Sequence, residues 1–395
     1  MTARTRLIVF LVSTPLLALV TVGGMMGGAR PARAAQRALP HLAVMEDARY
    51  LIENAYVEKV DVDKVMDGAM RGLVEGLDPS SAYLTPDEVT AMETKAALPA
   101  GDVGIVVTRQ FYLRVVGVRD GSPAAKAGLQ TGDFVRAIDN FATRDMSAYT
   151  GQRLLRGAPG SKVTLLIIRG NAADPHPIPL TREPMATDRV STRTLPSGQT
   201  LVRISSFGDG AVAALKSQVE ALGEAGKAGL AIDLRGTADG TPDDGIAAAR
   251  LFIKSGTLAV LAGRKGTERK EITAAPGDGA FAMPVILMVS NGTANAAEVF
   301  AAALARNKRT TLVGEPTAGL AAVQRLVKLP EGHGLWMTYA RYLKADDQPL
   351  HEQGLMPDDP VDIPVTPFDA PAPAPNAVDP LLSHAVKAFE IWKGK

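Results

Sequence analysis

Two spacings of apolar residues divide the chain into a helical region, a strand-rich region and a mixed region. From residue 40 to about residue 97, apolar side chains recur three and four positions apart, which predicts amphipathic helices. One helix carries Leu42 to Tyr56, and a second runs from Val62 to about Leu77, where Pro79 stops it. Thr85, followed by a proline and two acidic residues, predicts the start of a third helix. Residues 38–98 are therefore predicted to form a helical region.

Residues 99–184 change to short apolar runs separated by glycine turns, which predicts β-strands. Glycines also follow two short helical stretches, as is common at helix ends. The predicted strands are 103–107, 113–118, 134–138 and 163–169, and the predicted helices are 122–129 and 147–155. This region is expected to fold as one compact module.

Residues 185–364 alternate between predicted strands and helices, which favours an α/β layer with a largely parallel sheet. The strands are 200–204, 229–234, 284–289, 311–313 and 335–342, and the helices are 211–225, 243–253 and 296–305. Ligands of such sheets bind beyond the carboxyl ends of the strands, which here means residues 235–240 and 290–295. Residues 365–395 are predicted to form a Pro-rich linker and a C-terminal helix.

The first 34 residues have the pattern of a secretory signal. Arg4 and Arg6 precede an apolar run from residue 7 to about 22, and Ala32-Arg33-Ala34 resembles a cleavage site. The run approaches the roughly 20 residues needed to span a bilayer, so an uncleaved signal anchor is the alternative. Both interpretations predict an exported protein, either periplasmic or anchored to the inner membrane facing the periplasm.

Composition narrows the possible chemistry. The formal net charge of +1 gives no electrostatic reason to expect a nucleic-acid partner. The absence of cysteine excludes thiol nucleophiles, disulfides and thiolate metal sites, and the five histidines lack metal-ligand spacing. We therefore expect no metal and no cofactor.

Six short runs, in their order and spacing, resemble the carboxyl-terminal processing peptidases, which are PDZ-containing serine peptidases with a Ser/Lys dyad. They are Leu-Asp-Pro-Ser-Ser-Ala-Tyr-Leu-Thr-Pro at 77–86, the Gly-Ser-Pro-Ala stretch at 121–133, and the runs at 203–207, 233–236, 313–317 and 354–358. The resemblance implies a multi-domain α/β fold with an N-terminal helical segment. It also implies a β-barrel-like PDZ module at 99–184 and an α/β peptidase-like core at 185–364, similar to ClpP and crotonase.

The same resemblance identifies the positions of the dyad, and both residues are replaced. The family's serine lies in a run similar to Gly292–Glu298, at Asn295, and its lysine lies 25 positions later, at Leu320. An Asn carboxamide is not an activated nucleophile, and Leu has no titratable atom. Gln324 matches a glutamine that the family carries nearby. The chain is therefore expected to have lost the family's hydrolytic chemistry.

The predicted oxyanion region, at Gly240 and Ala296, is altered as well. The family's Leu-Arg-Gly-Asn-Pro-Gly-Gly loop reads Leu-Arg-Gly-Thr-Ala-Asp-Gly at 234–240, and a carboxylate at Asp239 would oppose a developing oxyanion. Two alternatives remain at this point. One is an active peptidase with a rearranged nucleophile, Thr293 or Ser290. The other is a non-peptidase site built from polar groups at Asp239, Asn295 and Glu298.

The peptide-binding part of the PDZ module is better preserved. Val103-Gly104-Ile105-Val106 resembles the loop whose backbone N–H groups bind a terminal carboxylate, next to a strand edge that accepts the peptide. Leu154 and Leu155 are predicted to line the groove, although Gly151 and Gln152 weaken the apolar character of this helix. The expected partners are polypeptide C-termini or an envelope protein, with an active paralogue as one possibility. Homo-oligomers through the N-terminal helices are a further expectation.

Overall fold

The computed structural model describes residues 40–391, except residues 96, 145, 171–173, 186–188, 265–267, 369 and 371–377. It contains two compact units, one ending at Met70 and one beginning at Arg71. The predicted signal or anchor at 1–34 lies outside the described residues, as does part of the Pro-rich linker. Among the residues that are described, no helix combines the length and the apolar character needed to cross a membrane.

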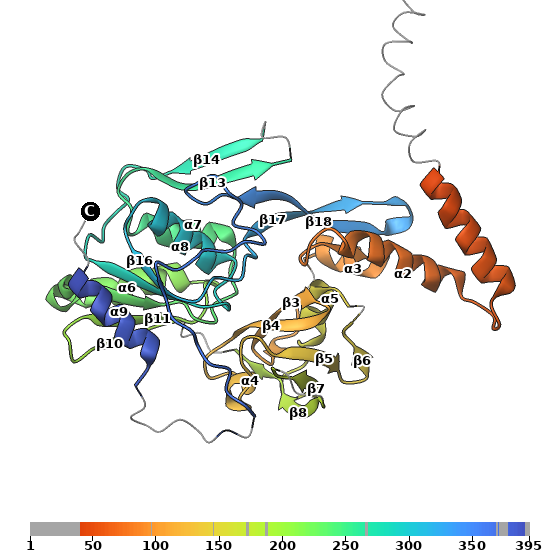
Figure 1. Ribbon diagram of the computed structural model, residues 1–395, viewed down its shortest axis with the longest axis horizontal. Coiled ribbons are helices and arrows are strands. Elements are labelled where there is room, and N and C mark those ends of the chain that lie inside the picture. The colour runs from red at the N-terminus through yellow and green to blue at the C-terminus, as the bar shows by residue number, and fades with distance from the viewer. Residues whose placement is uncertain are drawn as a thin grey trace, which may run out of the picture. The chain divides into compact units, whose positions relative to one another are not determined.

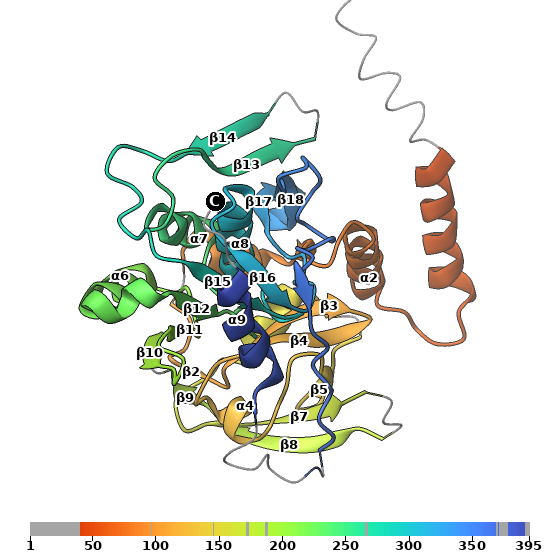
Figure 2. The same cartoon turned by 60° about the vertical axis from the view of Figure 1, so that its left-hand side comes forward.

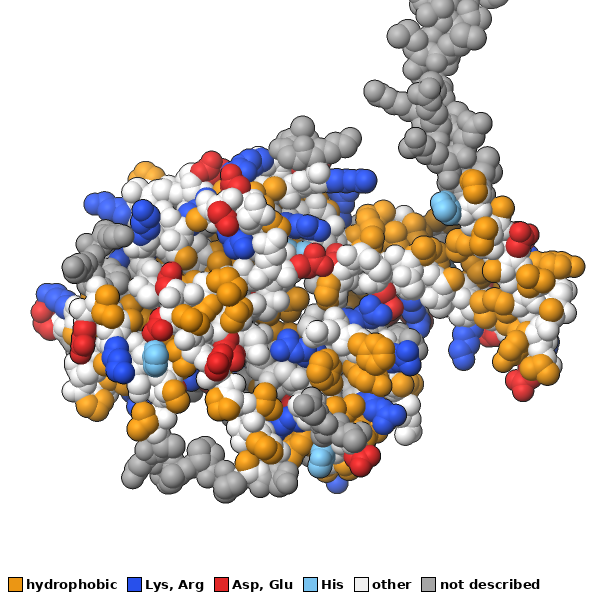
Figure 3. Space-filling view, in the orientation of Figure 1, with side chains coloured by type: hydrophobic (Ala, Val, Ile, Leu, Met, Phe, Trp, Pro, Cys, Tyr) orange, Lys and Arg blue, Asp and Glu red, His pale blue; other side chains and the backbone are white. Residues whose placement is uncertain are grey.

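The N-terminal unit is helical, as its periodicity predicted. Residues 40–55 form one helix, and α2 (Val62–Glu75) begins in this unit. Figure 3 shows hydrophobic side chains gathered over these helices, and the exposed ones include Leu42, Tyr50, Leu51, Tyr56 and Val57. The helical prediction is confirmed, and the apolar stripe of the first helix has large side chains open to solvent.

The start of α3 (Pro86–Glu93) shows why the local sequence forms a helix. Thr85 is the N-cap and accepts a hydrogen bond from the Glu88 backbone N–H, while the Glu88 carboxylate accepts one from the Thr85 N–H at 3.0 Å. This reciprocal capping box satisfies two donors that a helix start otherwise leaves without partners. The preceding segment, β1 (Ala82–Leu84), pairs with β18 (Gly334–Tyr342), so the 77–86 run joins the core.

The PDZ module consists of one β-sheet and short helices that pack against it. The strand order is β3-β4-β5-β7-β8, which leaves β3 at an edge, and α5 (Ala148–Leu154) contacts β3. The strands are β3 (Ile105–Gln110), β4 (Tyr112–Val118), β5 (Phe134–Ile138), β7 (Lys162–Ile168) and β8 (His176–Thr181). Short additions are α4 (Pro123–Lys126), β6 (Phe141–Ala142) and the β2–β9 ribbon (Gly101–Asp102 with Glu183–Pro184).

The peptidase-like core is built on a six-stranded sheet of order β10-β11-β12-β15-β16-β19, parallel from β11 to β19 (Figure 1). Its strands are β10 (Val190–Thr194), β11 (Thr200–Ile204), β12 (Leu230–Asp233), β15 (Val285–Val289), β16 (Thr311–Gly314) and β19 (Asp359–Pro360). The buried strands are apolar on both faces, as expected for a parallel sheet covered by helices on both sides.

Alternate residues of each central strand face different helices. Ile232 and Leu287 pack with α6 (Ala211–Ala221), α7 (Pro242–Arg250) and α8 (Ala296–Arg306), whereas Ala231 and Ile286 pack with α9 (Pro380–Ile391). Figure 2 shows α9 on one face of the sheet and α7 and α8 on the other. A 3₁₀ helix, η1 (Gly223–Ala228), replaces the end of the helix predicted for 211–225.

A second, antiparallel sheet of order β1-β18-β13-β14, with β17 beside β18, was not expected. Residues 335–342 were predicted to be a strand, but within the α/β layer; they belong instead to this sheet. Its other strands are β13 (Thr257–Gly263), β14 (Arg269–Thr273) and β17 (Ala322–Lys328), and a short 3₁₀ helix, η2 (Pro330–Gly332), connects β17 to β18. Most of β14 is polar and exposed, so it lacks the alternation that identifies a half-buried strand.

Candidate active site

Three loops meet at the carboxyl edge of the parallel sheet. They follow β12, β15 and β16, and they contain residues 234–240, 290–295 and 315–321. Parallel register brings their starting points to one edge, because Asp233 pairs with Met288 and Val289 pairs with Gly314. The candidate residues from all three loops therefore lie in one region, where sheets of this kind bind ligands.

Asn295 lies on a strained turn between β15 and α8. Its backbone has φ 50° and ψ −116°, a conformation that residues other than glycine rarely adopt. Its carboxamide Nδ2 donates a hydrogen bond to the Ala238 carbonyl at 2.7 Å. The strained turn presents the side chain at the predicted nucleophile position toward the altered loop after β12.

Leu320 lies in an apolar environment beside the same turn. It packs, half-buried, on a small cluster formed by Val116, Ala238 and Ala294, together with Val106 and Ala318. Since Ala294 precedes Asn295, the fold brings the two predicted dyad positions into one region. Gln324 lies on β17 and donates to Thr338 Oγ1 at 3.3 Å.

Glu298, on the first turn of α8, organises the loop that carries Leu320. Its carboxyl group is fully buried and accepts hydrogen bonds from Thr317 Oγ1 (2.6 Å) and the backbone N–H groups of Gly319 (2.6 Å), Leu320 (2.8 Å) and Ala321 (3.1 Å). Burial raises the pKa of Glu298 to about 7, although these donors favour the ionised form. Glu298 was predicted only as a polar group of a non-peptidase site, and its supporting role in the loop was not expected.

The raised pKa of Glu298 predicts a pH-dependent stability. The group binds its proton more tightly in the folded chain (pKa about 7, raised from 4.5), so its contribution is complete below pH 4.5 and is lost as pH rises through 7. Relative to Glu298→Gln, the free energy of unfolding of the native chain should fall by about 2–3 kcal/mol between pH 5 and pH 8. Chemical denaturation across this range measures it, and a pH-independent difference would contradict the expectation.

The two alternative nucleophiles have structural hydrogen bonds. Thr293 is fully buried, and its Oγ1 donates to the Leu234 carbonyl (2.9 Å) and accepts from the Ser290 N–H (3.0 Å). Ser290 Oγ accepts from the N–H groups of Gly236 (3.3 Å) and Gly292 (3.2 Å). Both hydroxyls connect the loops after β12 and β15.

Asp239 makes contacts at the predicted oxyanion region that a glycine could not. It forms an ion pair with Arg119 of the PDZ module and accepts a hydrogen bond from Ser206 Oγ at 2.7 Å. Gly240 has φ +90°, and a Cβ there would lie 2.5 Å from that of Phe207. Ala296, the other predicted oxyanion residue, is fully buried at the start of α8. A carboxylate thus connects the altered loop to the PDZ module.

One cavity of about 260 Å³ joins the predicted carboxylate-binding loop to the Asn295 turn. Its PDZ lining includes Asp102, Gly104, Ile105, Val106, Gln152 and Arg156, and its core lining includes Ser205, Ala238, Asp239 and Asn295. The lining contains no lysine, histidine or cysteine, and its one hydroxyl, Ser205, donates to the Arg189 carbonyl at 3.3 Å. None of the lining residues can therefore supply the lysine base that the family's chemistry requires.

The residues predicted to bind peptide do not all line one groove. Gly104 has φ +84°, and a Cβ there would lie 2.2 Å from that of Ser122, so the loop requires glycine. Val103 and Leu155 are fully buried in the core of the PDZ module, and Leu154 lines a different cavity. On α5, Gln152 forms hydrogen bonds with the backbone of β3 at Ile105 and Val107.

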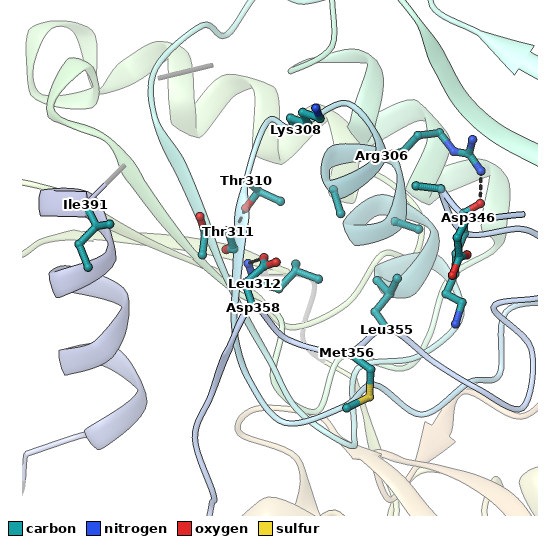
Figure 4. A pocket seen from close by; sticks show the side chains of 14 residues that line it. Arg306, Lys308, Thr310, Thr311, Leu312, Asp346, Leu355, Met356, Asp358 and Ile391 are labelled. Atoms are coloured by element: carbon teal, nitrogen blue, oxygen red, sulfur yellow. Dashed lines mark hydrogen bonds between the residues drawn. The ribbon is translucent and has the colours of Figure 1, made fainter. Parts of the chain in front are cut away.

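A larger cavity of about 880 Å³ lies away from these loops, between the ends of α8 and α9. Figure 4 shows Ile391 on one side and Arg306 and Asp346 on the opposite side, with Met356 below and between them. Arg306 donates to the carbonyls of Leu343 (3.1 Å) and Lys344. None of the predicted dyad, oxyanion or peptide-binding residues lines this larger cavity.

Comparison with known proteins identifies the family. The sequence model of Peptidase family S41 matches residues 199–361, that of the PDZ domain matches 114–169, and that of the activating protease CtpB N-terminal domain matches 27–88. A carboxyl-terminal-processing protease of Synechocystis is 32% identical over 298 residues, covering 74% of this chain and 69% of the relative. The chain belongs to the carboxyl-terminal processing peptidases.

A second sequence relative supports the family assignment, and a solved structure supports the fold. The carboxy-terminal processing protease CtpA of Bacillus subtilis is 29% identical over 308 residues, covering 78% of this chain and 66% of the relative. The solved structure of a photosystem II D1 C-terminal processing protease has a TM-score of 0.67 at 26% identity, covering 82% of this chain and 93% of that one. The predicted multi-domain α/β fold with a PDZ module is confirmed.

Proposed function

We propose that this protein is a catalytically inactive carboxyl-terminal processing peptidase homologue that binds polypeptide C-termini through its PDZ module. The observation that carries the proposal is the pair Asn295 and Leu320, on the strained turn and in the adjoining apolar cluster. Hydrolysis by the family's mechanism needs a hydroxyl nucleophile and a lysine base within hydrogen-bond reach. A carboxamide and an isobutyl group provide neither.

The surroundings of the two positions support the same proposal. Thr293 and Ser290 have structural hydrogen bonds, so a rearranged hydroxyl nucleophile would have to break contacts that hold the loops together. Asp239 adds a negative charge where the family's mechanism requires donors for an oxyanion. The non-peptidase alternative gains no support from these contacts, because Asn295 Nδ2, Asp239 Oδ2 and the Glu298 carboxylate all bond to groups of the protein itself.

The N-terminal signal pattern supports an exported location for the protein. Whether the signal is cleaved or retained as an anchor, the folded part would lie on the periplasmic side of the inner membrane. Its ligands would then be C-termini of exported polypeptides or of an envelope protein.

Binding without cleavage is the direct test of this function. The purified chain should bind unstructured decapeptides that end in a free carboxylate, and mass spectrometry should recover those peptides intact after prolonged incubation. Amidated versions of the same peptides provide the matched control, because they lack the charge that the PDZ loop is expected to recognise. Equal binding of free and amidated peptides, or release of shortened peptides, would contradict the proposal.

A further inference from the structure

The peptide-binding edge of the PDZ module already has a hydrogen-bond partner. β3 is an edge strand that pairs with β4 along one side only. On its other side, the Gln152 carboxamide from α5 donates from Nε2 to the Ile105 carbonyl at 3.0 Å and accepts at Oε1 from the Val107 N–H at 3.3 Å. A carboxamide has the same donor and acceptor as a peptide unit, so Gln152 imitates one unit of an added strand.

A side chain of the PDZ module also occupies part of the predicted carboxylate-binding loop. Asp102 is 5% exposed, and its Oδ1 accepts a hydrogen bond from the Gly104 N–H at 3.0 Å. Its Oδ2 lies 3.3 Å from the guanidinium of Arg156, which follows the end of α5. An internal carboxylate thus takes one N–H of the loop expected to bind a ligand's carboxylate.

Both contacts lie where a peptide would enter. Gln152, Arg156, Asp102 and Gly104 line the same cavity, which also contacts Ile105 and Val106. A peptide adding to β3 needs the Ile105 carbonyl and the Val107 N–H, because strand addition depends on main-chain hydrogen bonds. The incoming peptide must therefore replace the Gln152 carboxamide at both atoms.

We propose that Gln152 is an internal competitor for the edge of β3 and thereby sets the affinity of the PDZ module for extended peptide C-termini. This inference rests on the proposed function, because it concerns the same groove. The ligand class follows from the chemistry: only an extended backbone that offers both a donor and an acceptor compensates for the two hydrogen bonds that Gln152 loses. A side chain or small molecule that supplies one of them leaves the other backbone group without a partner.

The test compares the full chain with Gln152→Met, which keeps the length and flexibility of the side chain but removes its donor and acceptor. The probe is a pool of fluorescent decapeptides with a free C-terminal carboxylate and three randomised terminal residues. Gln152→Met should bind the preferred peptides about tenfold more tightly, since two modest hydrogen bonds no longer compete. Gln218→Met, at an exposed position of α6 in the peptidase-like part of the chain, is the matched control and should leave the affinity unchanged.

Hydrogen exchange at single amides separates this inference from the proposed function. The Val107 amide should exchange faster in Gln152→Met, whereas the Val115 amide, bonded to the Asp133 carbonyl at 2.8 Å, should not change. Equal or weaker peptide binding by Gln152→Met, with unchanged exchange at Val107, would overturn the role of Gln152 while leaving peptide binding itself intact. Failure of both forms to bind any peptide would overturn the proposed function, and with it this inference.

Discussion

Restoring the dyad with Asn295→Ser and Leu320→Lys should create a protein that cleaves unstructured substrates. The serine would occupy the strained turn before α8, and the lysine would enter the cluster formed by Val116, Ala238 and Ala294. An apolar environment lowers the pKa of a lysine and makes it a competent base near neutral pH. Electrophoresis of an unstructured protein with a free C-terminus, sampled during incubation, measures the rate of cleavage.

Asp239 should limit the activity of that double variant. Its carboxylate lies in the predicted oxyanion region and is paired with Arg119. Adding Asp239→Gly should raise the rate about 100-fold, the scale of a single oxyanion-hole interaction. Asn295→Ser with Leu320→Met is the matched control, because it fills the same space without a base. If the triple variant folds like the parent chain and stays inactive, the assignment of the two dyad positions is wrong.

Removing Asp133 should strongly destabilise the PDZ module. Asp133 makes two hydrogen bonds to Arg169, both at 2.7 Å, and the two side chains are 1% and 5% exposed. Asp133→Ala leaves the Arg169 guanidinium buried without its counter-ion, which costs about 3–5 kcal/mol. Hydrogen exchange of the β4 and β7 amides in the full chain measures the loss.

A surface ion pair of the same module provides the control for that experiment. Lys126 and Glu183 lie 3.0 Å apart, but their side chains are 62% and 47% exposed. Lys126→Ala should therefore change the free energy of unfolding by less than about 1 kcal/mol, because solvent screens the pair and holding two long side chains in one geometry costs entropy. If Asp133→Ala and Lys126→Ala lowered the free energy of unfolding by similar amounts, burial would not explain the strength of the Asp133–Arg169 pair.

The helices and most strands of the core could be predicted because their signals are local. The spacing of apolar residues predicted 296–305 and 200–204 almost as they occur in α8 and β11, and Thr85-Pro86 predicted the start of α3. The polar strand β14 carried no such signal, and 335–342 was expected in a different sheet because its partners are distant in the sequence.

The candidate site followed the same division between local and distant signals. Asn295 and Leu320 were recognised because motif spacing is a property of the sequence alone. The contacts around them were not, since Arg119 and Asp239 are 120 positions apart and Gln152 is 47 positions from Ile105. Glu298 could have been suspected as an acidic residue on an otherwise apolar helix face, because such a residue is rarely buried without several hydrogen-bond partners.

Catalytic inactivity is tested by incubating the purified native chain with an unstructured protein that has a free C-terminus, and in parallel with a serine-reactive fluorophosphonate probe. We expect no cleavage above that of a buffer control and no covalent labelling. Asn295→Ala, Thr293→Ala and Ser290→Ala are measured in parallel, so that any activity can be traced to a residue. Cleavage by the native chain that disappears in one of these variants would contradict the claim that this family member is catalytically inactive.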